Sequence, residues 1–245
     1  MSALGTAAGE VTRWLDAAAR RRAQQRIDRA FPAFPGNERR RLVRLAFRHR
    51  GRARALDRSM TRRSAVEFCS ALALEGWERL AEAASHGRGV IAVTAPFGLQ
   101  ATVRRALTLY RSAIDIATAG CETEDLLQPL ARGATIVTGL EPRGLSAHLV
   151  RAPLFGVELT VSSFAGELAS RAGAPVVTVL ASPEAGGVRL LAGHPIAMRE
   201  GAATAAEITR RLVRSFEAHL GRRPELFPWM EPFAESDTAV ERDGP

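Results

Sequence analysis

The side chains best suited to chemistry follow strands that the sequence predicts in the second half of the chain. Glu141 and Arg143 come shortly after a predicted strand at residues 135–138. The planar guanidinium of an arginine binds phosphate or sulfate through two parallel hydrogen bonds. A glutamate that is removed from water can act as a general base. Glu141 is therefore a candidate catalytic residue and Arg143 a candidate substrate-binding residue. The alternative is a surface turn that holds a solvated ion pair.

A second set of polar residues precedes or begins predicted helices. Ser162 and Ser163 stand directly before a helix predicted at residues 164–171. Serines at this position either cap the helix or help its first amides to bind an anion. Gln100 begins a helix predicted at residues 99–110, where its amide could polarise a carbonyl group or simply face water. We take Gln100 as a second catalytic candidate and the two serines as substrate-binding candidates.

Three further candidates lie at the end of the first strand of the alternating part. Thr94 closes this strand, and Phe97 and Gly98 follow it. In a parallel sheet, the loops after successive strands gather at one edge and form a cleft there. We therefore expect Thr94, Phe97 and Gly98 to bind substrate at the mouth that Glu141 and Arg143 also line.

The apolar periodicity divides the chain into a helical first part and an alternating second part. Helices are predicted at residues 10–31, after an N-cap at Asn37, and at 62–72 and 77–85. Strands are predicted at 89–95, 113–118, 135–138, 158–161, 175–181 and 188–192, with helices at 99–110, 123–132, 164–171 and 203–220. Strands that alternate with helices indicate a buried parallel sheet. We expect an α/β fold with a largely parallel central sheet flanked by helices.

This pattern indicates a single domain over residues 1–233. Residues 10–85 would form a helical N-terminal layer, and residues 86–233 would form the α/β body. The polar residues 234–245 are expected to form a flexible tail.

Positive charge is concentrated in the predicted helical layer. Residues 13–63 hold 17 of the 34 basic residues and four acids, and every basic residue of the chain is arginine. One explanation is a coding bias toward arginine on solvated helix faces. The other is a surface for an anionic partner, either an acidic carrier protein, a phospholipid surface or a nucleic acid. Nucleic acid fits least, because only 6% of the residues are aromatic and no stacking platform accompanies the arginines. The expected partner-binding residues are Arg39, Arg40, Arg41 and Arg44.

The composition also limits the class of protein. The 46% hydrophobic content suits a globular domain with a sizeable core. The two cysteines, Cys69 and Cys121, are too few for a disulfide scaffold and suit a reducing cytoplasm. We see no signal peptide and no uninterrupted apolar run of membrane-spanning length, so we expect a cytoplasmic protein. We also expect no metal and no cofactor, because no metal-ligand or dinucleotide motif stands in its proper context.

Several segments resemble, in order, those of a known enzyme family. They are Phe31-Pro32, residues 38–58 with Phe47-Arg48-His49 and Gly51-Arg52, Glu75-Gly76-Trp77-Glu78, Gly87-Arg88-Gly89-Val90-Ile91, Leu154-Phe155-Gly156, Leu168-Ala169, Gly173-Ala174-Pro175-Val176-Val177, and Arg223-Pro224-Glu225 with Trp229. Together they span residues 26–233 and are similar to the lipid A lauroyl and myristoyl acyltransferases of the lysophospholipid acyltransferase family. The resemblance implies an acyltransferase-type fold and transfer of an acyl group from a thioester to a hydroxyl. The stretch around Glu141 and Arg143 also resembles the motif with which glycerol-phosphate acyltransferases hold an acceptor phosphate.

The catalytic pair that this resemblance implies is missing from the chain. The family's reaction needs a histidine after the first strand and an Asp or Glu five positions later. The imidazole takes the proton of the acceptor, and the carboxylate orients the ring. Here Pro96 stands at the histidine position and Ala101 at the acid position, and none of the five histidines has an acid five residues later. We also expect this protein to lack the N-terminal membrane anchor that is usual in the family.

Three functions are open from the sequence. The first is an enzyme of specialised metabolism that acts on a substrate tethered to a carrier protein and uses catalytic residues other than the usual dyad. The second is a catalytically inactive homologue that serves as a partner subunit of another enzyme. The third is a peripheral phospholipid or lipid A-type acyltransferase, which the missing dyad disfavours.

Overall fold

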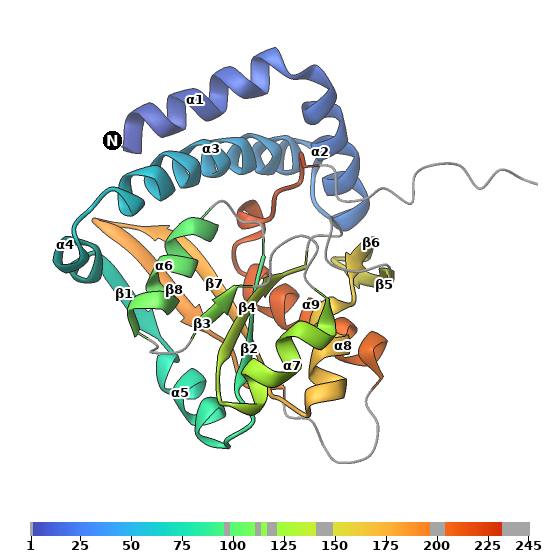
Figure 1. Cartoon of the computed structure of the whole chain (residues 1–245). Coiled ribbons are helices and arrows are strands. Elements are labelled where there is room, and N and C mark those ends of the chain that lie inside the picture. The colour runs from blue at the N-terminus through green and yellow to red at the C-terminus, as the bar shows by residue number, and fades with distance from the viewer. Residues whose placement is uncertain are drawn as a thin grey trace, which may run out of the picture.

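A six-stranded mixed sheet lies at the centre of the molecule (Figure 1). The computed structural model describes residues 2–95, 99–110, 114–116, 122–140, 149–196 and 204–231. The strands are β1 (Leu72–Glu75), β2 (Val90–Thr94), β3 (Ile114–Ile116), β4 (Thr135–Gly139), β7 (Val176–Glu184) and β8 (Gly187–Ala192), in the spatial order β1-β8-β7-β2-β4-β3. The pair β7–β8 is antiparallel, and the other four pairs are parallel. The predicted α/β class with a largely parallel sheet is confirmed.

Helices cover both faces of this sheet. They are α1 (Ser2–Leu15), α2 (Ala17–Ala30), α3 (Gly36–Thr61), α4 (Ala65–Ser70), α5 (Trp77–Ser85), α6 (Gln100–Tyr110), α7 (Thr123–Ala131), α8 (Phe164–Ala172) and α9 (Ala205–Leu220), followed by a short 3-10 turn, η1 (Pro224–Leu226). Helices α7, α8 and α9 pack on one face, and α5 and α6 pack on the other. Among the helices of the described part of the chain, none is long and apolar enough to cross a bilayer.

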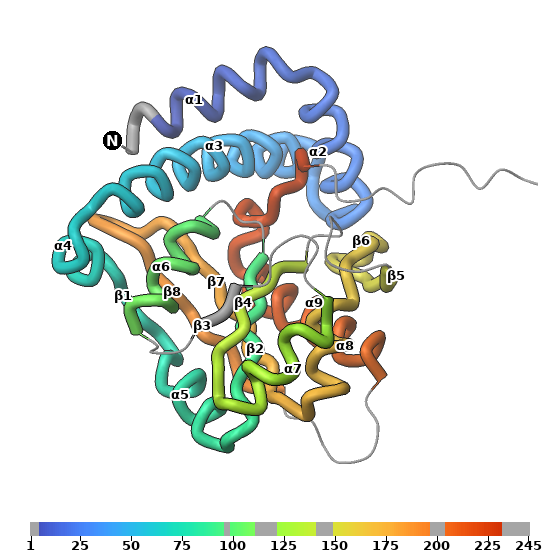
Figure 2. Tube along the Cα trace, viewed as in Figure 1, coloured from blue at the N-terminus to red at the C-terminus, as the bar shows by residue number. Residues whose placement is uncertain are grey.

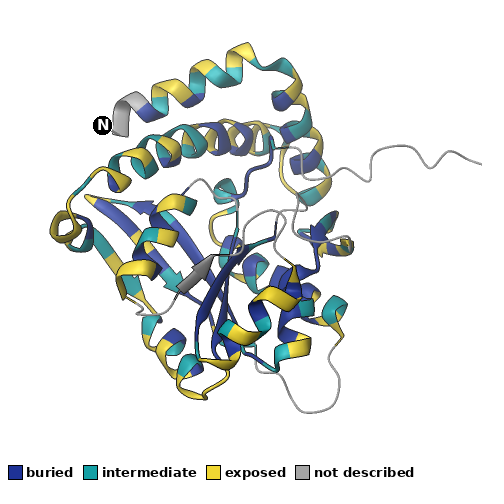
Figure 3. Cartoon of the chain, viewed as in Figure 1, coloured by how far each residue is buried: buried dark blue, intermediate teal, exposed yellow. Residues whose placement is uncertain are grey.

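The strands at the centre are buried on both sides, as an internal parallel sheet requires. All five residues of β2 are buried, and their side chains alternate between two apolar clusters. Ile91 and Val93 belong to the cluster under α8 and α9, whereas Val90 and Ala92 belong to the cluster under α6. Figure 3 shows this buried centre in dark blue between helices with exposed outer faces. The near-continuous run of Val, Ile and Ala in β2 is therefore explained by burial on two faces.

Several elements differ from the sequence prediction. The predicted N-cap at Asn37 is wrong, because α3 begins at Gly36 and Pro35 is its N-cap. The helix predicted at residues 10–31 is interrupted at Asp16, because the Asp16 carboxylate accepts a hydrogen bond from the amide of Ala19 at 2.8 Å and starts a new helix. The helix predicted at 62–72 is shorter, and its end is instead strand β1, which pairs with β8. The predicted strand at 158–161 corresponds to β6 (Val157–Ser162), which pairs with β5 (Leu149–Leu154) in a separate antiparallel hairpin.

The N-terminal layer is held together by close contact between the backbones of α1 and α3. These two helices lie side by side along most of α1 (Figure 2). A Cβ atom at Gly9 would overlap the carbonyl of Phe47, and one at Gly51 would overlap the carbonyl of Gly5. The glycines are therefore required by the closeness of the crossing. On the outer side of α1, Trp14 and Leu15 remain exposed.

The C-terminal end of α3 is joined to α6 by two sets of hydrogen bonds. The carboxylate of Asp57 accepts hydrogen bonds from the amide and the hydroxyl of Thr102, at 2.8 and 2.6 Å, and so caps the start of α6. In return, the guanidinium of Arg105 donates to the carbonyls of Met60 (2.8 Å) and Arg63 (2.6 Å) at the end of α3. An anion at a helix N-terminus and a cation at a C-terminus both stabilise the helix dipole.

The substitution Asp57→Ala should lower the free energy of unfolding by about 1–2 kcal/mol, because it leaves the amide of Thr102 without its capping acceptor. Urea denaturation of the purified protein measures this loss. The control is Arg58→Ala, which replaces the exposed neighbour on the same helix and should change stability by less than about 0.5 kcal/mol. Equal losses in the two variants would contradict the capping role.

Candidate functional site

The carboxyl ends of β2 and β4 meet at one edge of the sheet, under the helical layer. Thr94 ends β2 and lies in register with Gly139, which ends β4. Thr94 is buried, with 5% of its surface exposed, and half-buried Ala95 follows it. The predicted substrate-binding residues Phe97 and Gly98 lie outside the described residues. Thr94 and Gly139 thus end neighbouring parallel strands at the same edge of the sheet.

The start of α6, directly after this edge, already carries an anionic partner. Gln100 is the first residue of α6 and is half-buried, and it has a polar or electrostatic partner of its own. Two residues later, the amide of Thr102 is engaged by the carboxylate of Asp57. A carboxylate of the protein itself therefore already binds an amide in the first turn of α6. Gln100 remains the residue of α6 nearest to the end of β2 along the chain.

Ser162 and Ser163 lie at the corner between β6 and α8, and both are buried, with 1% and 2% of their surfaces exposed. The hydroxyl oxygen of Ser162 accepts a hydrogen bond from the amide of Phe164 at 3.3 Å, so it caps the first turn of α8. The hydroxyl of Ser163 donates to the carboxylate of Glu167, one helical turn away. The two serines thus have different roles, a local cap and a hydroxyl–carboxylate pair.

This corner is joined directly to the end of β4. The amide of Ser162 donates to the carbonyl of Leu140 at 3.3 Å. Leu140 is the residue before Glu141, so the chain that carries Glu141 and Arg143 leaves the sheet beside Ser162. Glu141 and Arg143 themselves lie outside the described residues. The hydrogen bond between Ser162 and Leu140 places the start of the segment after β4 beside the corner that holds the two serines.

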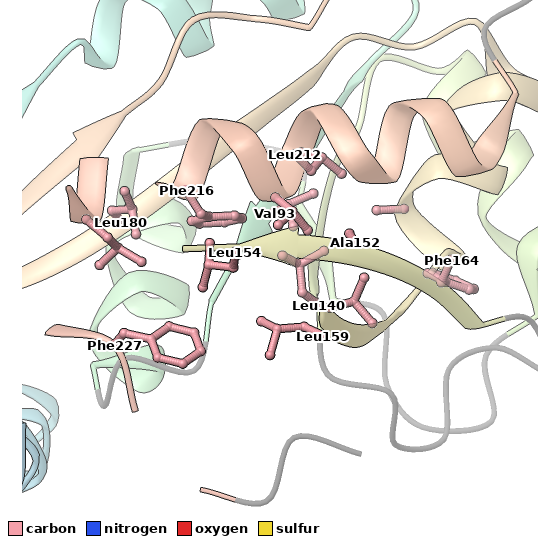
Figure 4. Packing of buried hydrophobic residues seen from close by; sticks show 14 of the residues in the cluster. Val93, Leu140, Ala152, Leu154, Leu159, Phe164, Leu180, Leu212, Phe216 and Phe227 are labelled. Atoms are coloured by element: carbon pink, nitrogen blue, oxygen red, sulfur yellow. The ribbon is translucent and has the colours of Figure 1, made fainter. Parts of the chain in front are cut away.

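Thr138 is a buried hydroxyl without a hydrogen-bond partner in the described structure. It is 4% exposed, and its Oγ1 atom has no donor or acceptor within reach. Thr138 lies in register with Val93 on β2, so it belongs to the same face of the sheet. Figure 4 shows the apolar side chains on this face, with Val93, Leu140 and Phe164 among them. An unpaired hydroxyl in such surroundings is costly and is often found where a ligand completes it.

Much of the positive charge of the helical layer is used inside the molecule. The guanidinium of Arg26 is buried and donates to the carbonyl of Trp229 at 3.1 Å. Arg50 and Arg54 both bind the carboxylate of Glu231, at 2.5 and 3.2 Å. Burial and the neighbouring charge of Arg50 lower the pKa of Arg54. These arginines therefore anchor the end of the described chain to α2 and α3.

The four predicted partner-binding arginines divide into two kinds. Arg39 is half-buried and forms an ion pair with Asp28 at 3.2 Å. Arg40, Arg41 and Arg44 are exposed and have no ion pair or hydrogen bond with another described residue. The exposed positive surface of α3 is thus formed by these three residues.

Three residues of the site region were not found by sequence reasoning. Thr138 and Asp57 give no local signal, because the unpaired hydroxyl of one and the capping contact of the other depend on distant elements. The contact of Glu167 with Ser163 could have been predicted from the sequence, since the two residues are four positions apart and helical spacing brings such pairs together.

A separate polar cluster lies at the opposite edge of the sheet, where β1 and β8 end. His219, in the last turn of α9, is half-buried, and burial is the main cause that lowers its pKa from 6.5. The nearby charges are those of Glu75, Arg79 and His194. No three His, Cys, Asp or Glu side chains come together as a metal site among the residues that the structure describes.

No protein-family model matches the chain, and no curated protein matches it either. The resemblance to the acyltransferases therefore rests on the segments of the sequence quoted above.

The substitution Thr138→Val should raise the free energy of unfolding by about 1 kcal/mol, because it replaces an unpaired buried hydroxyl with a methyl group of similar shape. Chemical denaturation measures the change. Thr178→Val is the matched control, because buried Thr178 has its hydroxyl 3.1 Å from that of Ser215 and should lose stability instead. A loss of stability in Thr138→Val would show that the hydroxyl is satisfied.

Stability should fall as the pH drops from about 7.5 to 5.5, partly because of His219. Its pKa is lowered in the folded protein, so the unfolded chain binds the proton first, below about pH 6.5. His219→Gln should reduce this slope, whereas His86→Gln, at an exposed position, should leave it unchanged. Urea denaturation at several pH values measures both. Parallel pH profiles for wild type and His219→Gln would refute the assignment.

Proposed function

We propose that this protein acts on a substrate tethered to an acidic carrier protein, on an acyltransferase-type scaffold that has lost the usual histidine–carboxylate dyad. The observation that carries the proposal is the group of buried polar side chains at the carboxyl edge of β2 and β4. Thr138, Ser162 and Ser163 lie on the side of α8 and α9, and Thr94 ends β2 on the other face of the sheet, all at less than 6% exposure. Ligands of parallel α/β sheets bind at the carboxyl ends of the strands, and Thr138 is, among the described residues, the unpaired polar group at this end of the sheet.

The roles of the residues follow from their chemistry. Arg143 would hold an anionic group of the acceptor, and Ser162 would lie beside it, since its amide bonds Leu140. Glu141 would serve as the general base, and Gln100 would donate a hydrogen bond to the reacting carbonyl. Glu141 takes the proton from the acceptor hydroxyl as its oxygen attacks the thioester carbon. The carbon–sulfur bond breaks, and the same proton passes to the carrier thiolate.

The exposed arginines of α3 support an acidic partner. Arg40, Arg41 and Arg44 present three positive charges that no described residue neutralises. Complementary charge of this kind speeds association with an acidic protein. The helical layer that bears these arginines also reaches the catalytic edge, because Asp57 of α3 binds the start of α6. A carrier docked on α3 would therefore lie on the side of the molecule from which this edge is approached.

A second candidate function is a non-catalytic partner subunit. It is favoured by the contact between Asp57 and Thr102, which occupies the start of the helix after the first strand. In the family that the sequence resembles, this is the region that carries the catalytic pair. Under this hypothesis, the basic surface of α3 would dock the carrier or another enzyme while the chemistry takes place elsewhere.

One experiment separates the two candidates. The protein is purified from its native host, and mass spectrometry identifies co-purifying carriers and the groups attached to them. The loaded carrier is then incubated with wild type, Glu141→Gln and Arg143→Ala. Loss of the acyl group from the carrier with wild type, and its retention with both variants, supports the enzyme. Binding of the carrier with no turnover in any sample supports the partner subunit.

The triple variant Arg40→Glu, Arg41→Glu, Arg44→Glu should bind the acidic carrier at least tenfold more slowly, because it reverses the steering charge. Binding of wild type should also weaken steeply between low salt and about 0.5 M salt. Surface plasmon resonance measures both effects.

The matched control reverses Arg210, Arg211 and Arg214 on α9. These residues are exposed and have the same spacing along their helix as the α3 trio. The control should retain wild-type association. If both triple variants bind alike, the docking surface is not on α3; if anionic vesicles bind and the carrier does not, the surface faces a membrane.

A further inference from the structure

A cavity of about 290 Å³ lies between the second half of α3 and the turn that joins β7 to β8. This turn lies beneath α3 at the end of the β7–β8 hairpin (Figure 1). One wall is formed by Arg52, Leu56 and Ser59 of α3 and by Arg63, which lies two residues after the end of α3, and the opposite wall by residues 184–187. The spacing of four and three residues places Arg52, Leu56 and Ser59 on one face of the helix. Two arginines therefore line one small cavity.

The turn contributes backbone to the cavity in place of side chains. Gly186 has a φ of 85°, which favours glycine, and a Cβ atom there would meet nothing within 4 Å. A Cβ atom at Gly187 would overlap the carbonyl of Ala71, so this residue must also be glycine. Arg52 holds the turn by donating to the carbonyl of Glu184 at 3.4 Å. The opening thus stays free of side chains next to the two arginines.

The cavity has an excess of positive charge. Glu184 is its one acid, and both carboxylate oxygens of Glu184 bind Arg189 on β8. The exposed carboxylate of Glu67, which does not line the cavity, interacts electrostatically with Arg63. This carboxylate is also hydrogen-bonded to the hydroxyl of Ser64. Arg52 and Arg63 are therefore left facing a space whose only carboxylate already has a partner.

The position of Arg63 is fixed by α6. The backbone carbonyl of Arg63 accepts a hydrogen bond from Arg105 at 2.6 Å, and the Arg105 guanidinium also stacks on the ring of Phe68, 4.5 Å from its centroid. This contact holds the residue that follows the end of α3. The backbone from which the Arg63 side chain extends is thus fixed, and the Arg52 guanidinium is held by the carbonyl of Glu184.

We propose that this cavity binds the phosphate group of a phosphate ester, and that this phosphate is the one that links the pantetheine arm to the carrier protein; the second part rests on the proposed function. Arg52 and Arg63 offer paired N–H donors of the geometry that phosphate oxygens accept. Ala185 and Gly186 of the turn lie on the opposite wall. The cavity volume suits a small anionic group and no large ligand.

The distance to the catalytic edge supports the arm as the source of the phosphate. Val179 of β7 lies in register with Thr94, and Glu184 is five residues further along the same strand. At about 3.3 Å per residue, this separation is roughly 17 Å. Between its phosphorus and its sulfur, a pantetheine arm has about 13 bonds, which extend to roughly 16 Å at the rise per bond of an extended chain. A phosphate in the cavity would thus leave the thioester near Thr94.

Isothermal titration calorimetry at low salt tests the site with three probes: inorganic phosphate, phosphopantetheine and pantetheine. Phosphopantetheine should bind saturably, phosphate should bind more weakly, and pantetheine should not bind. Arg52→Gln and Arg63→Gln should each weaken phosphopantetheine binding at least tenfold, because each removes a charged pair of donors. The control is Arg62→Gln, at an exposed position that does not line the cavity.

The outcomes separate this proposal from the proposed function. Absence of phosphopantetheine binding, or equal binding by wild type and both arginine variants, would overturn it. Leu56→Phe, which narrows the cavity and keeps both arginines, should also abolish binding and covers the case in which an arginine variant fails to fold. If phosphate and phosphopantetheine bind equally, free phosphate is the ligand. If the arm binds here but no carrier transfers its group, the anion site stands and the enzymatic proposal fails.

Discussion

The contact between α3 and α6 is the constraint on which the rest of the structure depends. Asp57 caps the start of α6, and Arg105 caps the end of α3, so each helix supplies the charge that the end of the other requires. This exchange fixes the helical layer over the carboxyl edge of the sheet. It also places a negatively charged side chain at the start of the helix that follows β2. The carboxyl ends of β2 and β4 therefore lie near a carboxylate that the protein itself supplies.

The same contact explains how one helix can take part in several functions. On one side α3 packs into the core through Phe47 and Met60, and on another side it touches α1 through Gly51. A third side lines the cavity with Arg52, Leu56 and Ser59. Because α3 is 26 residues long and packs on the body of the protein, different parts of it can make each of these contacts. Its arginines are consequently divided among internal ion pairs, an anion cavity and an exposed surface.

The sequence was informative where local pattern decides the outcome. The run Val90–Thr94 and the helix Trp77–Ser85 were predicted nearly as they are, because burial and amphipathic spacing are local signals. Strand β1 was missed since Leu72–Glu75 is compatible with a helix and becomes a strand only beside β8. The site divides in the same way. Ser162 and Ser163 could be found from their position before a helix, whereas Asp57 and Thr138 acquire their significance only from distant partners.

The order of the strands also bears on how the chain is made. Leu72 pairs with Val188, so β1 cannot enter the sheet until more than a hundred further residues have left the ribosome. At 5–20 residues per second, this delay is roughly 6–20 seconds. During this time the apolar side of β1 and the underside of α3 have no sheet to cover, and long-range pairing of this kind is slow and exposed to aggregation. Biosynthesis of this fold thus places a demand on chaperones that its finished, well-buried sheet does not reveal.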